Sequence, residues 1–242
     1  MKKTLFLAGA TGAIGRRLAP LLLADGWRVV GTTRSAEKVP SLRQMGFEPV
    51  VVDVFDPAAL KRAVAEARPE VVMHQLTDLP HALEANQMAD ALVRNARLRE
   101  EGTRNLVAAA VAAGARRLIA QSIAFIYAEG PLPHREEDPL LPVSHAVYGE
   151  TSRAVMSLER QVVEAALDGV VLRYGLFYGP GTGFDAPIAP GSVHVDAAAK
   201  AAVLALTRAR PGIYNVAEAD PSLTSEKAIR DLAWDPSFRV GG

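Results

Sequence analysis

The chain has no cysteine among its 242 residues. Disulfide bonds, thiolate zinc sites and cysteine nucleophiles are therefore excluded before any motif is considered. An excess of charge of one sign is missing too, because 27 basic residues balance 27 acidic ones. Because the net charge is zero, no electric field would attract nucleic acid or anionic lipid, and we expect neither as a partner. We also expect no metal site.

Long hydrophobic runs are also absent. No stretch approaches the roughly 18 uninterrupted apolar residues that a membrane-spanning helix needs. The start, MKKTLFLAGATGAIGRR, combines two lysines with an apolar run, but Gly9 and Gly12 interrupt that run and two arginines follow it. Such a run is too short and too early charged for an export signal, so these features predict a cytoplasmic protein.

Short apolar runs rich in β-branched residues alternate with helical patterns as far as about residue 175. The runs are apolar on both faces, which is typical of central parallel strands covered by helices on both sides. The alternation predicts an α/β fold with a doubly wound parallel sheet, a Rossmann fold. The expected strands are 4–8, 28–32, 49–54, 70–75, 116–122 and 169–174, and the expected helices are 13–24, 35–45, 57–67, 84–112 and 149–167.

The composition shifts to glycine and proline after residue 175, in YGPGTGFDAPIAPGS, which indicates a set of turns. A helix over 196–208 with Asp196 as its cap, a strand over 212–217 and a last helix from about Thr224 are expected to follow. We therefore expect a Rossmann domain over 1–175 and a short C-terminal α/β region over 176–242 packed on it.

The segment RNARLREEGTRN (94–105) carries two pairs of opposite charges at i,i+4, Arg97 with Glu101 and Glu100 with Arg104. We interpret it as a solvated helical face, with a partner surface as the alternative.

A glycine turn stands between the first expected strand and the first expected helix. Glycines permit a tight turn and let backbone N–H groups approach a pyrophosphate, whose charge is stabilised at a helix N-terminus. A turn that needs glycine for steric reasons alone is the alternative, but the strand before it and the helix after it favour a dinucleotide. The residues expected to hold the cofactor here are Gly9, Thr11, Gly12, Ala13, Ile14 and Gly15.

Several motifs occur in an order that is more specific than any one of them. They are GATGAIG (9–15), VVDVFD (51–56), VVMHQLTD (71–78), GTRNLVAAAVAAGARRLIAQS (102–122), VVLRYGLFYGPG (170–181), VHVDAAAKA (193–201) and LAWDPSF (232–238). With these motifs the chain resembles the short-chain dehydrogenase/reductase superfamily, in its extended or atypical NAD(P)-dependent epimerase/dehydratase branch. The resemblance covers nearly the whole chain and implies an NAD(P)-binding domain followed by a substrate-side region.

The resemblance also implies roles for residues beyond the glycine turn. Asp53 and Val54 should flank the adenine, and Leu76 and Thr77 should line the ribose and nicotinamide side. From the residues alone, Asp53 could equally cap the end of a strand.

The end of the second strand bears on the choice between NAD and NADP. NAD binding usually needs an acidic residue there, whereas this chain has two threonines and Arg34. The planar fork of an arginine suits a 2′-phosphate, because it can donate twice to phosphate oxygens. Glu37 could be the acid displaced by a turn, and Arg34 could be a surface arginine without a ligand. We predict NADP, with NAD less favoured.

Catalysis in the family uses a serine or threonine, a tyrosine and a lysine four residues after the tyrosine. The tyrosine exchanges a proton with the substrate oxygen while the lysine lowers the tyrosine pKa and binds the nicotinamide ribose. The candidate catalytic residues here are Ser122, Tyr148 and Ser152, where Ser152 stands in the lysine position and brings no charge. Tyr148 is the expected acid/base; Tyr127 or His145 in that role, or the loss of hydride chemistry, are the alternatives.

Two further departures concern register. The family serine normally stands four residues before a tyrosine of the kind seen at Tyr127, and that position is Ile123. A shift of one residue in an extended segment turns the side chain to the other face. An alignment on Glu159, which resembles a glutamate eight residues after the family tyrosine, would put Thr151 and Val155 in the tyrosine and lysine positions.

The loop that forms much of a sugar-nucleotide pocket in the extended branch is short here, with only TGFDAPIAPGSV (182–193) in its place. This indicates a small or open pocket. We predict an NADP-dependent oxidoreductase or epimerase-like enzyme that acts on a small hydroxyl or carbonyl compound. The alternative is a sensor or scaffold that binds NADP(H) without turnover. The resemblance further implies a homodimer built from the helices at 84–112 and 149–167.

Overall fold

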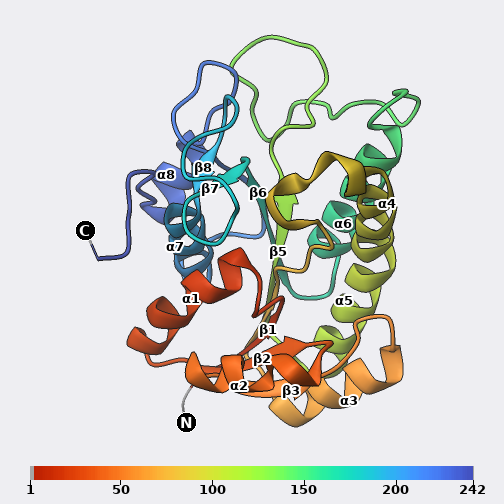
Figure 1. The fold of residues 1–242 in the computed structure, drawn as a ribbon, viewed down its shortest axis with the longest axis vertical. Helices are drawn as coiled ribbons and strands as arrows, with labels where there is room; N and C mark the ends of the chain where they lie inside the picture. Colours follow the sequence, from red (N-terminus) through yellow and green to blue (C-terminus); the bar gives the residue numbers. More distant parts are fainter. Residues whose placement is uncertain (1–2, 242) are drawn as a thin grey trace.

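The computed structural model describes residues 3–241. Strands and helices alternate along the chain (Figure 1). The first half holds β1 (Thr4–Ala8), α1 (Ala13–Ala24), β2 (Arg28–Thr33), η1 (Ala36–Lys38), α2 (Val39–Gln44), β3 (Glu48–Val51), α3 (Pro57–Ala67), β4 (Val71–His74), η2 (His81–Leu83), α4 (Ala85–Arg97), the π-helical η3 (Leu98–Gly102) and α5 (Thr103–Ala112). The second half holds β5 (Arg117–Ile123), α6 (Gly149–Val163), β6 (Asp168–Tyr174), β7 (Phe177–Tyr178), β8 (Val193–His194), α7 (Val195–Ala205), β9 (Gly212–Val216) and α8 (Glu226–Leu232).

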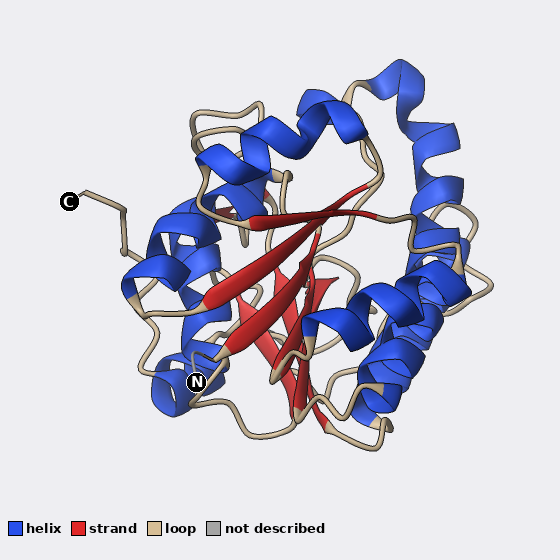
Figure 2. Cartoon of the chain, turned by 90° about the horizontal axis from the view of Figure 1, so that it is seen from below, coloured by secondary structure: helices blue, strands red, loops and turns tan. Residues whose placement is uncertain are grey.

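Seven strands form one parallel sheet in the order β3-β2-β1-β4-β5-β6-β9. Figure 2 shows these strands between two groups of helices. The predicted doubly wound α/β fold is confirmed. No helix within residues 3–241 is long and apolar enough to cross a membrane.

The central strands β1, β4, β5 and β6 bury both of their faces, as the sequence predicted, whereas the edge strand β3 is partly exposed. On β1, Leu5 and Leu7 pack into the layer of α1 and α7, whereas Phe6 and Ala8 pack into the layer of α3 and α5. Successive side chains of a strand point to opposite faces, so a run that is apolar at every position serves two cores at once.

The segment after residue 175 completes the sheet. Its strand β9 pairs with β6, and its helix α7 packs on α1. The segment thus packs on the rest of the fold, while the boundary at 175 stays a prediction.

Asp196 is not the cap of α7, so that prediction is wrong. His194 is the N-cap, and its Nδ1 accepts a hydrogen bond of 3.1 Å from the backbone N–H of Asp196. The helix begins at Val195, and the Asp196 carboxylate pairs with Arg17 of α1 and accepts from the N–H of Val240.

The expected helix over 84–112 is α4 and α5 joined by the π-helical η3. The predicted pair of Arg97 with Glu101 forms, at 2.7 Å. The predicted pair of Glu100 with Arg104 does not, because Glu100 binds Arg153 of α6 at 2.7 Å instead. Part of this segment is therefore a contact between helices and not a solvated face.

Candidate active site

A cleft of about 1100 Å³ crosses the carboxyl ends of β1, β2, β4, β5 and β6. Because all these strands are parallel, their ends meet at one edge of the sheet. In such sheets ligands bind outside these ends, next to the point where the strand order reverses, which here lies between β1 and β4. The volume exceeds the roughly 300–1,000 Å³ of single small-molecule sites, so the cleft has room for a dinucleotide and a further compound.

The glycine turn forms one wall of the cleft. Gly9 has φ +93°, and a Cβ on it would collide with the carbonyl of Gln75. A Cβ on Gly15 would collide with the carbonyls of Gly9 and Ala10, so this helix can approach the strand only without a side chain there. Gly12 is the N-cap of α1 and offers no side-chain cap, and the first turn holds no acidic residue. The free N–H groups of this turn fit a pyrophosphate.

Most of the residues expected to hold the cofactor lie together along the cleft. Ile14 and Gly15 do not, because Ile14 is buried in the core and Gly15 packs beneath the turn. The carboxylate of Asp53 does not line the cleft either; it accepts from the N–H of Phe55 at 3.0 Å, the strand-end capping that the sequence left open. The expected residues that line the cleft are Gly9, Thr11, Gly12, Ala13, Arg34, Val54, Leu76 and Thr77.

The end of the cleft at β2 is basic. Arg16, Arg34 and Lys38 line it, whereas Glu37, the alternative acid, is not among its lining residues. The guanidinium of Arg34 lies 3.6 Å from the carboxylate of Asp78, on the opposite wall. A bound 2′-phosphate at this end would meet several cationic groups and no carboxylate on the β2 side.

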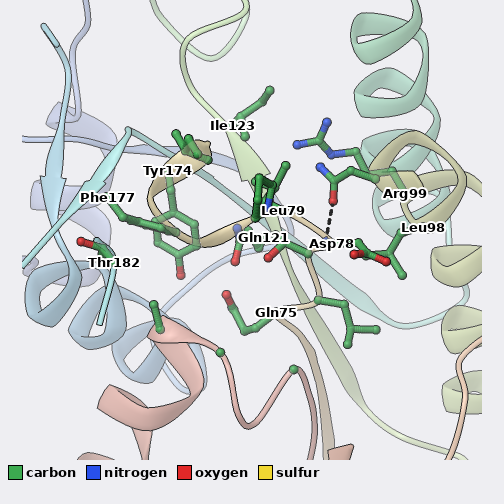
Figure 3. A pocket seen from close by; sticks show the side chains of 18 of the residues that line it. Gln75, Asp78, Leu79, Leu98, Arg99, Gln121, Ile123, Tyr174, Phe177 and Thr182 are labelled. Atoms are coloured by element: carbon green, nitrogen blue, oxygen red, sulfur yellow. Dashed lines mark hydrogen bonds between the residues drawn. The ribbon is translucent and has the colours of Figure 1, made fainter. Parts of the chain in front are cut away.

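Three polar side chains project from the ends of β4, β5 and β6 into the same space: Gln75, Gln121 and Tyr174 (Figure 3). The side-chain amide of Gln75 and the hydroxyl of Tyr174 are buried and have no hydrogen-bond partner among residues 3–241. Burial raises the pKa of Tyr174, so its hydroxyl stays neutral. Unpaired buried polar groups are costly, and these fit the carboxamide and hydroxyl groups of a nicotinamide riboside. The sequence analysis missed all three residues.

Of the three candidate catalytic residues, only Tyr148 is exposed at the cleft. Its side chain is 48% exposed at the start of α6, and its ring stacks on His145. The hydroxyl of Ser122 donates to Glu159 of α6 at 2.7 Å, and that carboxylate also binds Arg173. Ser152 is fully buried, and its hydroxyl donates to the carbonyl of Leu141.

Residues of both alignments lie at this end of the cleft. Ile123 points into the cleft in place of a serine (Figure 3), and Thr151 lines it beside Tyr148. Val155 is buried against Ile123 and Ile126. Which of the two alignments gives the family's tyrosine and lysine positions stays a prediction.

The other proton donors that the sequence left open are not at the cleft. The hydroxyl of Tyr127 donates to Asn215 at 2.7 Å, and burial raises the pKa of Tyr127. The Nδ1 of His145 accepts backbone N–H groups of its own turn. Among residues 3–241, Lys38 is the only lysine that lines the cleft, and it lies at the β2 end.

A cation, Arg99, lines the end of the cleft away from β2. Its side chain extends from η3 and is 9% exposed. It lies on the inner stripe of the helix, as Ala91, Asn95 and Leu106 do. That spacing of three and four residues was readable in the sequence, where the analysis considered only the charge pairs around it.

An open parallel sheet with this strand order, and with a glycine turn after its first strand, belongs to the dinucleotide-binding Rossmann proteins. Within that class, residues 5–191 match the NAD dependent epimerase/dehydratase family, and the chain belongs to that family.

Known proteins of two kinds are similar to the chain. It is 42% identical to a 3-diazoavenalumate denitrifying reductase of Streptomyces sp. over 89% of this chain and 76% of that protein. It is 33% identical to a dTDP-4-dehydrorhamnose reductase of Streptomyces griseus over 72% of this chain and 50% of that protein. The UDP-glucose 4-epimerase of Thermotoga maritima, solved with UDP-glucose, has the same fold, with a TM-score of 0.77, 19% identity and coverage of 98% and 94%.

The predicted superfamily, a nicotinamide cofactor and the enzymatic function are confirmed as general assignments. The protein is an NAD(P)-dependent enzyme of the oxidoreductase or epimerase type. The relatives carry the names of reductases and epimerases, which favours an enzyme over the alternative of a sensor without turnover.

Proposed function

We propose that this protein is an NADPH-dependent reductase whose acceptor takes up hydride without a proton from an activated tyrosine. The observation that carries the proposal is that no lysine among residues 3–241 lines the cleft beside Tyr148. Ser152, in the lysine position after Tyr148, is buried against a carbonyl, and Val155, which the alignment on Glu159 puts in that position, packs in an apolar cluster. The lysine that the family uses to activate its tyrosine thus has no counterpart beside Tyr148.

The preference for NADPH is supported by the β2 end of the cleft. Arg34 and Lys38 reach this end from the segment after β2, and Arg16 reaches it from α1. A 2′-phosphate there would accept charge-assisted hydrogen bonds, which are about twice as strong as neutral ones. The 2′-hydroxyl of NAD would find no carboxylate on the β2 side to accept from it.

The walls of the acceptor end favour a small, flat, largely apolar compound. They are formed by aliphatic and aromatic side chains, which pack well against a ring. These side chains are Ile123, Phe125, Ile126, Leu176, Phe177, Phe184 and Ile188.

An aryl diazonium compound is an acceptor that fits these conditions. The name of the Streptomyces reductase supports it, because that protein is called a denitrifying reductase of a diazo compound. NADPH, when bound, would supply a hydride that ends on the ring carbon as the C–N bond breaks and N₂ leaves. The negative charge of the hydride cancels the positive charge of the diazonium group, so the reaction requires no proton donor. The residues of the cleft need only hold the ring against the reduced nicotinamide and exclude water.

The alternative is the reduction of a small carbonyl compound with Tyr148 as the proton donor. In that reaction the new alkoxide must receive a proton, and Tyr148 is the exposed hydroxyl closest in sequence to the position the family uses. The two functions therefore differ in their dependence on one phenol.

The experiment follows the absorbance of NADPH at 340 nm with two acceptor sets, aryl diazonium salts and matched aldehydes and ketones. Wild-type protein should consume NADPH with a diazonium salt well above the rate with heat-denatured protein, and Tyr148→Phe should change that rate less than about threefold. If only carbonyl compounds are reduced, and Tyr148→Phe abolishes their reduction, the carbonyl function replaces the proposed one.

A further inference from the structure

Arg99 is a buried cation without a counter-ion. Its side chain is 9% exposed, and it forms no hydrogen bond or ion pair with any of residues 3–241. Figure 3 shows it reaching from the helical wall toward Ile123, at the end of β5. An unpaired buried charge destabilises a fold, so we expect a residue of this kind to bind an anionic group of a ligand.

The groups around Arg99 do not neutralise it. His74, at the end of β4, is fully buried, and burial together with the charge of Arg99 lowers its pKa to about 4, so it is neutral at physiological pH. Glu159 is the acidic group whose charge raises the pKa of Arg99, but its carboxylate already binds Arg173 and Ser122. Burial lowers the pKa of Arg99 itself only to about 10, so its side chain remains charged.

The anions of a bound cofactor would lie elsewhere in the cleft. The pyrophosphate belongs at the glycine turn of β1, and the 2′-phosphate belongs near Arg34, after β2. Arg99 lies next to His74 at β4 and points toward β5. Strands are about 5 Å apart, so β4 is about 10 Å from β2 across the sheet.

We propose that Arg99 binds a carboxylate of the hydride acceptor, so that the substrate is a small aromatic or otherwise flat acid. This inference rests on the proposed reductase function and specifies its substrate class. A guanidinium donates two parallel hydrogen bonds to a carboxylate, which fixes both the position and the orientation of the acid. The apolar walls would hold its ring, with the reactive carbon facing the nicotinamide.

Binding can be measured without turnover, so this test is independent of the reaction. Cinnamate and benzoate are titrated against the NADP⁺ complex of the protein, with cinnamamide and benzamide as neutral matches of the same shape. Wild-type protein should prefer the carboxylates, and Arg99→Gln should weaken their binding roughly 10- to 100-fold while leaving the amides unchanged. Arg99→Lys should retain part of the preference. Arg104→Gln, which removes an exposed arginine of α5, should change nothing.

Two outcomes would overturn the inference. If acids and amides bind equally to the wild-type protein, Arg99 does not select a carboxylate. If Arg99→Gln instead weakens NADPH and leaves the acids alone, the anion that it binds is a phosphate of the cofactor. Failure of NADPH turnover with every acceptor would contradict the proposed reductase function alone, because the titration does not depend on turnover.

A stability measurement separates a binding role from a structural one. Arg99→Met keeps the length of the side chain and removes the unpaired charge, so the ligand-free variant should melt a few degrees higher than the wild type. The same variant should lose the preference for cinnamate over cinnamamide. A lower melting temperature for Arg99→Met would indicate that Arg99 supports the fold, and would contradict the proposal.

Discussion

At the scale of single residues, Asp78 connects two arginines of which only one lines the cleft. Arg34 lies 3.6 Å from its carboxylate and Arg94 lies 3.5 Å from it. All three side chains are partly exposed, so each ion pair contributes little to stability, about 0–1 kcal/mol. The arginines are therefore free to serve a ligand, and they form a natural pair of test and control.

Replacing Arg34 by alanine should weaken NADPH and leave NADH nearly unchanged. The variant loses a charged hydrogen bond to the 2′-phosphate, which corresponds to about 1–3 kcal/mol of binding free energy, and NADH has no such group. Fluorescence titration of each reduced cofactor measures the two affinities directly.

Arg94→Ala is the matched control, because it removes a partner of Asp78 that does not line the cleft. It should leave both affinities unchanged. An equal loss of NADPH and NADH binding in Arg34→Ala would show that Arg34 does not distinguish the cofactors, and the preference for NADP would have to be abandoned.

The predictability of the site also differs residue by residue. The glycines could be predicted because their need is steric: a Cβ on Gly9 would collide with the backbone after β4. A catalytic role could not be assigned to Ser122 from the sequence, because the face of β5 that it occupies depends on the register. In the structure its hydroxyl donates to Glu159. Gln75 and Tyr174 follow no pattern in one sequence, since only the folded sheet brings the ends of β4 and β6 to one space.

At the scale of elements, His74 links the end of β4 to α5. Its Nε2 lies 3.0 Å from the hydroxyl of Thr103, and its Nδ1 accepts the N–H of Leu76. The imidazole is thus neutral and bonded on both sides. Protonation would break the bond to Leu76 and place a second charge beside Arg99.

Folding stability should therefore fall with acidification between about pH 6.5 and pH 4. The unfolded chain protonates His74 near 6.5, whereas burial and Arg99 lower the pKa of the folded protein's His74 to about 4. The unfolded state then binds more protons in this window, so stability is fully present above pH 6.5 and is lost toward pH 4, by about 3 kcal/mol. Urea unfolding at a series of pH values measures this slope.

His74→Asn should flatten the slope between pH 6.5 and pH 4, because asparagine does not titrate. The variant is expected to be less stable at pH 7, since Asn is smaller and leaves space in the core. An unchanged slope in His74→Asn would show that the acid sensitivity arises from other groups.

The elements themselves were largely predictable from the sequence. Runs that are apolar on both faces predicted six of the seven strands of the sheet, because central parallel strands must bury both faces, and β9 was expected separately over 212–217. The prediction over 49–54 ran past the end of β3 at Val51, which is an edge strand with one neighbour only. The π-helical turn in η3 was not predictable, since it follows from packing against α6 and not from local preference.

At the scale of the whole molecule, α4 and α6 present apolar side chains on the outside of the fold. Val93 of α4 is 56% exposed, and Met156 and Val163 of α6 are also exposed. The two helices pack against each other, on the helical layer opposite α7 and α8 (Figure 1). The ion pair of Glu100 with Arg153 joins η3, which follows α4, to α6. Apolar groups framed by charges are typical of a contact with another protein.

We expect this surface to form a homodimer, as the family resemblance implied. Sedimentation at micromolar concentration should give about twice the mass of the 25.8 kDa chain. A double change, Val93→Glu with Met156→Glu, should return the mass to that of one chain, because it would bury two carboxylates against their symmetry mates. Ile229→Glu is the matched control, since Ile229 is an equally apolar and exposed residue of α8 on the other layer; it should leave the mass doubled. A wild-type mass near 25.8 kDa would show that α4 and α6 do not pair in solution, and that their exposed valines and methionine belong to the surface of a monomer.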